Sequence, residues 1–417
     1  MLESTPTSAN WAVSGPQQEP HAWPKLAPAG ADFLTLRQQG YLMVDKTALL
    51  PLLACKRNVF LARPSGFGKS MLLTQLKELF THGTESFTGL AVQGSWHKPL
   101  NPHVILVDLR GLCDPATLEQ DLIERLCSAV SAAGFTEARD LPHKCAQLNQ
   151  AYSELSALIR GAHLVVLIDD WDFPLWANLH DEAAFAANAQ HLKGLFSWLR
   201  CLEKVDFIMV TGIGRFKLSS NSDFLQDISM DPVFAPLLGY TREELQFYFA
   251  AYLAQVAALS HSSEAELLRQ LEQWYGGFCF DRKAAVQLFP PRAINAFLAQ
   301  LNDQRSTPPK FGCLWPERIN TTLGLQAYLK GHQLSWEQFL DLKAQGVTLT
   351  QVQLTAPLAF ESINLVRLMV QTGFLTIKDV VDPKEQSRFK RCFHCNFTNA
   401  AAEELLACMM SERDRLG

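Results

Sequence analysis

The stretch RNVFLARPSGFGKSMLLTQLKELF, residues 57–80, contains the features that decide the fold. It opens with a short apolar run of the kind found in buried strands. A turn with two glycines follows, RPSGFGKS at residues 63–70, and after it leucines recur at helical spacing. The sequence therefore predicts a strand, a tight turn and a helix in direct succession.

Further apolar runs extend this unit along the chain. They occur at residues 103–109 (HVILVDL), 163–168 (HLVVLI) and 206–210 (DFIMV). None alternates between apolar and polar residues, which is typical of parallel strands covered on both faces. Segments of helical periodicity separate the runs. This pattern predicts an α/β fold with a mostly parallel sheet between helices, followed by a smaller, mostly helical domain.

The composition limits the classes of function. Of the 417 residues, 48% are hydrophobic, which excludes a chain that is disordered throughout. The net charge of −5 argues against a general polyanion binder, so direct nucleic-acid binding is not expected.

No apolar run reaches the roughly 18 residues that span a bilayer. The N-terminal residues lack the basic and apolar regions of a secretory signal. We therefore expect a cytoplasmic protein without a membrane partner.

The turn RPSGFGKS has the composition of a phosphate-binding loop. In such loops successive backbone N–H groups surround a phosphate, and the next helix contributes the positive end of its dipole. Lys69 would supply charge to the β- and γ-phosphates and Ser70 a hydroxyl ligand to the metal, so ATP and Mg²⁺ are the expected cofactors. The expected nucleotide-binding residues are Arg63, Pro64, Ser65, Gly66, Phe67, Gly68, Lys69, Ser70 and Met71. Arg63 stands where such loops usually begin with glycine.

Two acids end the third predicted strand, HLVVLIDD at residues 163–170. Asp169 is the expected second Mg²⁺ ligand beside Ser70. Asp170 is the expected catalytic carboxylate that polarises the attacking water, at a position where P-loop NTPases commonly have glutamate. Because a positioning error of about 1 Å can cost about a hundredfold in rate, the shorter Asp170 predicts slow hydrolysis. Asp172 is an alternative carboxylate for this role, and a loop or cap role is open for both.

Polar residues also follow the fourth predicted strand. Thr211 ends it and is expected to sense the γ-phosphate. Arg215 is expected to contact that phosphate as an arginine finger, with a surface ion pair as the alternative. Arg63 is a rival for the same role. Tyr41, which precedes the loop, would stack on the base, unless residues 40–47 (GYLMVDKT) merely start a helix.

Seven motifs in this order resemble the bacterial AAA-ATPase-like family of P-loop NTPases. The motifs are DFLTLRQQGYLMVDKT (32–47), RPSGFGKS (63–70), LIDDWDFPL (167–175), TGIGRFK (211–217), DISMDPVFAPLLGYTREEL (227–245), WYGGFCF (274–280) and QTGFLTIK (371–378). Phosphate loops of the family also read Arg-Pro in place of the first glycine. Trp171 and Phe173 replace the Tyr and Lys that the family tends to have. Many members are fused to a PD-(D/E)XK nuclease-like domain, but no Glu-x-Lys strand follows residue 380, so we do not expect DNA cleavage.

The resemblance and the patterns together predict four segments. These are a disordered tail at 1–30, a P-loop NTPase domain at 31–240, a helical lid domain at 241–378 and a C-terminal tail at 379–417. Thr241 and Glu244 predict a capping box at the start of the lid domain. The expected function is a slow Mg²⁺-dependent ATPase that acts as a conformational switch. The alternatives are a nucleotide-dependent interaction scaffold without turnover and an accessory factor to a separate nuclease. The expected partners are ATP and an unknown protein, and a homo-oligomer is open.

Overall fold

The computed structural model describes most of the 417 residues. The described ranges are 23–98, 102–218, 223–303, 306–314, 324–326, 328–329, 334–381 and 391–416. Across these ranges no helix is long and apolar enough to cross a membrane.

A five-stranded parallel sheet forms the centre of the molecule. Its strands are β1 (Asn58–Ala62), β2 (His103–Asp108), β3 (Leu164–Asp169), β4 (Val205–Gly212) and β5 (Gln226–Asp227). The order across the sheet is β2-β3-β4-β1-β5. Every residue of β3 is buried, as a non-alternating apolar strand requires. The predicted α/β fold is confirmed.

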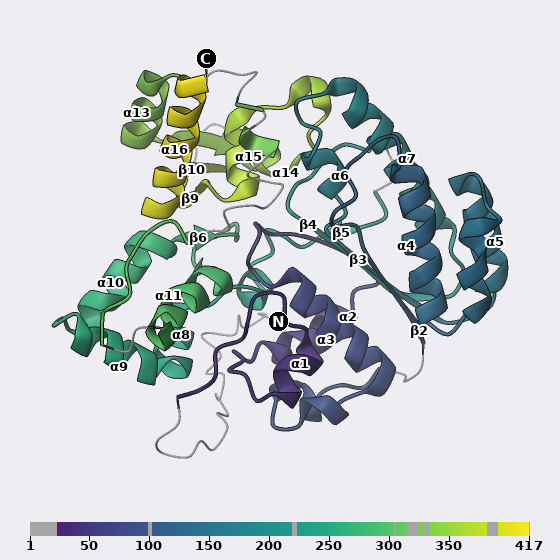
Figure 1. Ribbon diagram of the computed structural model, residues 1–417, viewed down its shortest axis with the longest axis horizontal. Coiled ribbons are helices and arrows are strands. Elements are labelled where there is room, and N and C mark those ends of the chain that lie inside the picture. The colour runs from purple at the N-terminus through teal and green to yellow at the C-terminus, as the bar shows by residue number, and fades with distance from the viewer. Residues whose placement is uncertain are drawn as a thin grey trace, which may run out of the picture.

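Helices cover the sheet on both sides (Figure 1). The purple and dark-blue helices of the N-terminal part lie on one side, and the teal helices lie on the other. The first group is α1 (Phe33–Gln38), α2 (Leu50–Ala54) and α3 (Lys69–His82). The second group includes α4 (Leu118–Ala132), α5 (Leu148–Leu158) and α7 (Glu182–Cys201), with the short α6 (Phe173–Trp176) before α7. Six short 3-10 helices complete this list: η1 (Thr47–Leu49), η2 (Glu85–Phe87), η3 (Ala91–Gly94), η4 (Thr136–His143), η5 (Ala235–Leu237) and η6 (Phe360–Ser362).

Four further helices have a hydrophobic core of their own. They are α8 (Arg242–Tyr248), α9 (Ala250–Leu259), α10 (Glu264–Tyr275) and α11 (Pro291–Asp303). The predicted capping box starts α8, because the Thr241 hydroxyl accepts from the backbone of Glu244 and the Glu244 carboxylate accepts from the backbone of Thr241. Phe249, Tyr252 and Phe297 are buried in this second core.

The C-terminal part differs from the expected helical domain and tail. A two-stranded ribbon, β6 (Phe278–Cys279) and β7 (Gln287–Leu288), is followed by an antiparallel sheet of β8 (Val347–Thr350), β9 (Leu375–Val381) and β10 (Cys392–Phe397). The helices around it are α13 (Trp336–Gln345), α14 (Gln351–Thr355), α15 (Leu365–Thr372) and α16 (Ala400–Leu416). β10 is the central strand, and its burial alternates along CFHCNF. β10 pairs with β8 and β9, which lie earlier in the chain. Its own residues show only a short strand pattern, so these long-range pairs explain why the expected tail is folded.

The N-terminal boundary also differs from the expectation. Residues 1–22 lie outside the described part, but residues 23–30 pack on the folded molecule. The Tyr252 hydroxyl donates to the Pro24 carbonyl at 2.7 Å, and the Leu42 N–H donates to the Lys25 carbonyl at 2.7 Å. Both contacts join this segment to distant parts of the chain, which local composition does not reveal.

The position of β10 predicts that the C-terminal strand is part of the folding unit. Phe393 is completely buried in a core with Leu349, Leu354 and Ile377. Phe393→Ala should lower the free energy of unfolding by about 3–5 kcal/mol through lost burial and an unfilled cavity. Urea denaturation followed by circular dichroism measures the change. Val352→Ala is the control, because Val352 on α14 is 70% exposed. Equal stability of the two variants would contradict this role for β10.

Candidate nucleotide site

A pocket of about 820 Å³ lies at the carboxyl end of the parallel sheet. In open α/β sheets ligands bind at this end of the strands. Residues 65–72 form one wall, and the segment that follows β3 forms another. The N-terminal segment and the first turns of α11 also line the pocket. It is therefore bounded by the sheet domain and by the second, helical core.

The phosphate-binding loop has the backbone geometry that its sequence predicts. Gly66 and Gly68 have φ angles of 83° and 99°, a left-handed conformation that side chains with a Cβ rarely adopt. α3 begins directly after Gly68, so the N–H groups of its first turn have no intrahelical acceptor. Ser65, Phe67 and Met71 line the pocket with both glycines. The loop thus presents backbone donors and the positive end of a helix dipole to the pocket.

Lys69 and Ser70 bring the polar side chains of the loop into the pocket. The Lys69 ammonium donates to the carbonyls of Arg63 and Pro64 at 3.1 and 3.4 Å. It also lies 3.8 Å from a carboxylate oxygen of Asp170. Ser70 is exposed at the start of α3. These contacts hold the Lys69 side chain at the base of the loop, on the pocket wall.

Arg63 and Pro64, in contrast, do not line this pocket. They line a separate cavity of about 50 Å³. Arg63 is buried, where it donates to the carbonyls of Ala62 and Ser229 at 2.9 and 2.8 Å. Burial, together with the charge of Arg215, lowers the pKa of Arg63 to about 9. Arg63, which replaces the usual glycine, therefore holds the loop through hydrogen bonds outside the pocket. Neither a phosphate contact nor an arginine-finger role of Arg63 fits this position.

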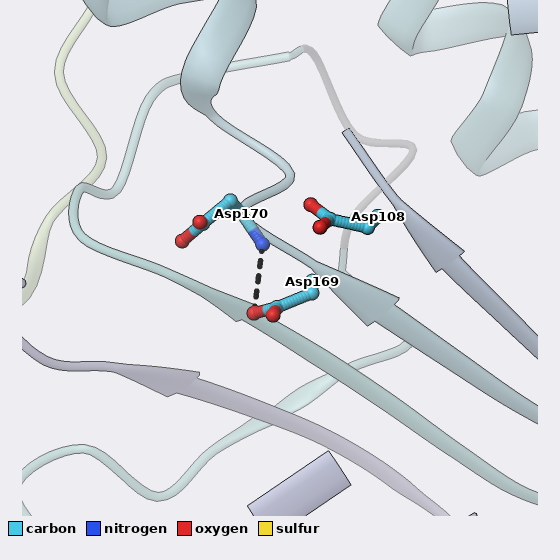
Figure 2. A group of neighbouring side chains, drawn as sticks. All are labelled: Asp108, Asp169 and Asp170. Atoms are coloured by element: carbon cyan, nitrogen blue, oxygen red, sulfur yellow. Dashed lines mark hydrogen bonds between the residues drawn. The ribbon is translucent and has the colours of Figure 1, made fainter. Parts of the chain in front are cut away.

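Three carboxylates meet where β2 and β3 end (Figure 2). The two parallel strands pair in register, and this places Asp108 opposite Asp169. Asp170 follows at the turn. An oxygen of each carboxylate lies within 4.8 Å of an oxygen of the other two. Oxygen ligands at this spacing are the type that Mg²⁺ binds. Sequence analysis identified Asp169 and Asp170 but missed Asp108, whose only signal was its place at the end of a neighbouring predicted strand.

Asp169 is held by hydrogen bonds at the end of β3. The Thr211 hydroxyl donates to its Oδ1 at 2.7 Å, and the Asp170 N–H donates to the same oxygen at 3.1 Å. Burial and then the charge of Asp170 raise the pKa of Asp169, while hydrogen bonds from Ser70 and Thr211 and the charge of Lys69 oppose the rise. Thr211 is buried and acts on the pocket as a partner of Asp169, not as part of its wall.

Asp170 adopts an unusual backbone conformation. Its φ angle is 46°, in the left-handed region that a non-glycine residue rarely occupies. The conformation turns the chain sharply after β3 and places the carboxylate on the pocket wall. There the Arg110 Nε donates to it at 2.9 Å, and Lys69 lies on its other side. Such strain commonly accompanies functional positions.

Asp172 is excluded from the role of alternative catalytic carboxylate by its hydrogen bonds. It is 1% exposed, and it accepts from the Trp176 indole at 2.7 Å and from the Ile213 N–H at 3.0 Å. The Gly214 N–H is a third donor. Burial raises the pKa of Asp172 to about 6, although these donors oppose the rise. Asp172 thus joins the turn after β3 to the turn after β4 by hydrogen bonds. This position matches the loop or cap role that was the alternative for Asp172.

Arg215 is not brought to the pocket. Its Nε donates to Asp227 at 2.6 Å, and its backbone N–H donates to the Gln371 side chain at 3.2 Å. It lines the smaller cavity with Arg63. The arrangement matches the ion-pair alternative for Arg215. An arginine-finger role for this chain's own pocket has no support in the position of its guanidinium.

Two other arginines line the pocket and were missed by sequence analysis. Arg110 follows β2, and its Nη2 donates to the Ser70 hydroxyl at 2.9 Å. Arg292, in the first turn of α11, donates its N–H to the Gly66 carbonyl at 3.3 Å. The only signal for Arg110 was its place two residues after a predicted strand end. Arg292 had none, because it lies more than 200 residues after the loop.

Part of the pocket wall is apolar. Leu36, Leu42, Met43 and Val44 line it from the N-terminal part of the chain. Tyr41 is absent from the described pocket wall, and its ring lies under the Lys25 ammonium at 4.4 Å. The residues that follow Tyr41 thus provide the apolar surface that a base requires, whereas the stacking role expected of Tyr41 does not fit its position.

The donor set fits a magnesium nucleotide. The pocket wall combines a loop of backbone donors, an ammonium, a serine hydroxyl, the Asp170 carboxylate and an apolar part, and the buried Asp169 lies directly beside Ser70. Phosphates match the donors, Mg²⁺ matches the hydroxyl and carboxylate oxygens, and a base matches the apolar wall. Among the described residues, Asp108, Asp169 and Asp170 are the cluster of side chains with spacing suited to a metal.

Comparison with known proteins agrees with this geometry. The model of the AAA-ATPase-like family, described as "Predicted AAA-ATPase", matches residues 29–221. An "Uncharacterized protein in vnfD 5'region" of Azotobacter chroococcum mcd 1 is 28% identical over 385 residues, which cover 88% of this chain and 67% of that protein. Over residues 29–221 the chain thus matches the AAA-ATPase-like family, which confirms the resemblance for the four motifs in this range; the motifs at 227–245, 274–280 and 371–378 lie outside the match.

Proposed function

We propose that this protein binds ATP with Mg²⁺ in the pocket and hydrolyses it slowly, and that the bound nucleotide acts as a conformational switch. The observation that carries the proposal is the convergence of Lys69, Ser70 and Asp170 on the wall of one pocket, with the buried Asp169 directly beside Ser70 and Lys69. The match to the AAA-ATPase-like family over residues 29–221 supports it.

Each residue has a distinct role in the proposal. The N–H groups of the loop and the Lys69 ammonium bind the phosphates, since they offer donors and positive charge at the start of α3. Ser70 and Asp169 hold Mg²⁺, which would neutralise charge on the β- and γ-phosphates. Thr211 keeps the Asp169 carboxylate in place through its 2.7 Å hydrogen bond. Asp170 orients the attacking water from the pocket wall.

The environment of Asp170 supports slow turnover. The residue is one methylene shorter than glutamate, and its carboxylate is engaged by Arg110 at 2.9 Å. An attacking water must compete with the Arg110 guanidinium for this carboxylate. The same observation favours a second candidate, a scaffold that binds ATP without hydrolysing it. Phosphate release by the purified protein separates the two functions.

The contact between the loop and α11 supports the switch. Gly66 and Arg292 are joined by a backbone hydrogen bond of 3.3 Å, so the wall of the pocket includes the second core. Nucleotide in this pocket would contact both parts of the chain. A ligand favours the arrangement that it binds better, and only by the difference in affinity.

Lys69→Ala should weaken ATP binding by about 10- to 100-fold, as expected for loss of charge-assisted hydrogen bonds to phosphate. Isothermal titration calorimetry measures the affinity. Lys77→Ala is the matched control, since Lys77 is an exposed lysine on the same helix. Equal affinity of the wild type and Lys69→Ala would rule out the phosphate-loop assignment.

Asp170→Glu should raise the rate of phosphate release several-fold with nearly unchanged ATP affinity, because the added methylene brings the carboxylate nearer to the attacking water. Asp170→Asn, which cannot accept a proton, should abolish release and serves as the control. A slower rate in Asp170→Glu would mean that the site is built around aspartate. No release by the wild type, with ATP binding intact, would favour the scaffold.

Amide hydrogen exchange should report the switch in α11. ATP with Mg²⁺ should slow exchange in residues 291–301 more than ADP does, since the triphosphate reaches further toward Arg292. Arg292→Ala should remove the difference between ATP and ADP. Exchange in α13, which does not line the pocket, should stay constant and is the internal control. If α11 exchanges equally in the free, ADP-bound and ATP-bound protein, the helical part is a fixed appendage.

A further inference from the structure

We infer that Arg110 is an internal cation of the metal site. It competes with Mg²⁺ for Ser70 and Asp169, and once Mg²⁺ has displaced it, its guanidinium contacts the γ-phosphate. The inference rests on the proposed nucleotide function. It assigns a specific role to a residue that neither the motifs nor the family match identified.

The contacts of the guanidinium are the first argument. Nη2 donates to the Ser70 hydroxyl at 2.9 Å and lies 3.7 Å from a carboxylate oxygen of Asp169. Nε donates to Asp170 at 2.9 Å. Ser70 and Asp169 are the groups that fit Mg²⁺, which requires oxygen ligands at about 2.0–2.1 Å. A guanidinium hydrogen-bonded to the same oxygens repels a divalent cation and occupies part of its ligand set, so the two cations exclude each other.

The charge of the cluster is the second argument. Asp108, Asp169 and Asp170 have oxygens within 4.8 Å of one another, and Lys69 alone lies near them from the phosphate loop. Removal of a carboxylate from water is costly unless a positive charge is close. The Arg110 guanidinium donates to Asp170 at 2.9 Å and lies 3.7 Å from an oxygen of Asp169. Arg110 thus supplies the second positive charge of the cluster in the absence of a metal.

The attachment of Arg110 allows it to change partners. Its side chain is 51% exposed, so about half of it is free of packing against the protein. Its backbone is fixed separately, because its N–H donates to the Asp108 carboxylate at 2.8 Å. The planar fork of the guanidinium reaches Ser70 and Asp170 in a fixed geometry, whereas a lysine ammonium acts as a point charge. The guanidinium is therefore able to leave the carboxylates while the loop stays in place.

The position of Arg110 also determines its new partner. Arg110 and Gly111 line the same pocket as Lys69 and Ser70. A γ-phosphate bound to Lys69 and to a metal at Ser70 would lie beside the displaced guanidinium. Arginine binds phosphate oxygens through charge-assisted hydrogen bonds. An ADP molecule lacks this phosphate, so the contact distinguishes the two nucleotides.

The first test measures Mg²⁺ binding without nucleotide. Mg²⁺ is titrated into the full-length wild type and Arg110→Ala, and the melting temperature is followed. The Mg²⁺ concentration for half of the shift should be about tenfold lower in Arg110→Ala, as expected when a charged competitor is removed. Arg110→Lys should lie between the two. Arg125→Ala is the matched control, because Arg125 is an exposed arginine that is not among the residues lining the pocket. Equal Mg²⁺ midpoints in the wild type and Arg110→Ala would overturn the competition.

The second test measures nucleotide preference by calorimetry at saturating Mg²⁺. The ratio of affinities for a non-hydrolysable ATP analogue and ADP should fall about tenfold in Arg110→Ala and stay unchanged in Arg125→Ala. An unchanged ratio in Arg110→Ala would overturn the phosphate contact. Failure of the wild type to bind either nucleotide would instead refute the proposed function and, with it, the phosphate contact, and the Mg²⁺ titration would still test the competition.

Discussion

The balance of charge at the carboxyl end of the parallel sheet is the constraint on which the site depends. β2 and β3 pair in register and bring Asp108 and Asp169 to the same edge, with Asp170 directly after them. Three adjacent carboxylates repel one another, and burial makes the ionised form of Asp169 costly. Lys69 from α3 and Arg110 from the loop after β2 compensate this charge. The pocket has its anion-binding and cation-binding groups within a few ångströms because these elements converge there.

The second constraint is the backbone of the phosphate loop. Gly66 and Gly68 take left-handed conformations, and α3 starts immediately afterwards. The buried side chain of Arg63 supports the loop on the side away from the pocket, through the carbonyls of Ala62 and Ser229. A loop fixed in this way keeps its donors in place before a ligand arrives, which lowers the ordering cost of binding.

The two hydrophobic cores meet at this loop. One core lies around the sheet, and the other lies among α8, α9, α10 and α11. Each core buries its own large side chains, and polar contacts join the two around the pocket. The Arg292 N–H donates to the Gly66 carbonyl at 3.3 Å, and the Lys46 ammonium pairs with Glu244 at 2.6 Å. The proposed switch would act across this junction.

The sequence by itself determined those features that depend on neighbouring residues. Apolar runs predicted β1, β2, β3 and β4, the glycine turn predicted the phosphate loop, and the acid after β3 predicted Asp169 as a metal ligand. Such patterns are readable because strand burial, left-handed turns and helix starts are local properties. Only the tertiary structure decided which charges meet. Arg215 pairs with Asp227, Arg63 turns beneath the loop, and Arg110 joins Ser70 and Asp170 from other elements. Likewise β10 folds only by pairing with β8 and β9. Long-range contacts of this kind leave no periodic signal in the sequence, since they depend on how distant elements pack and not on the spacing of residues along the chain.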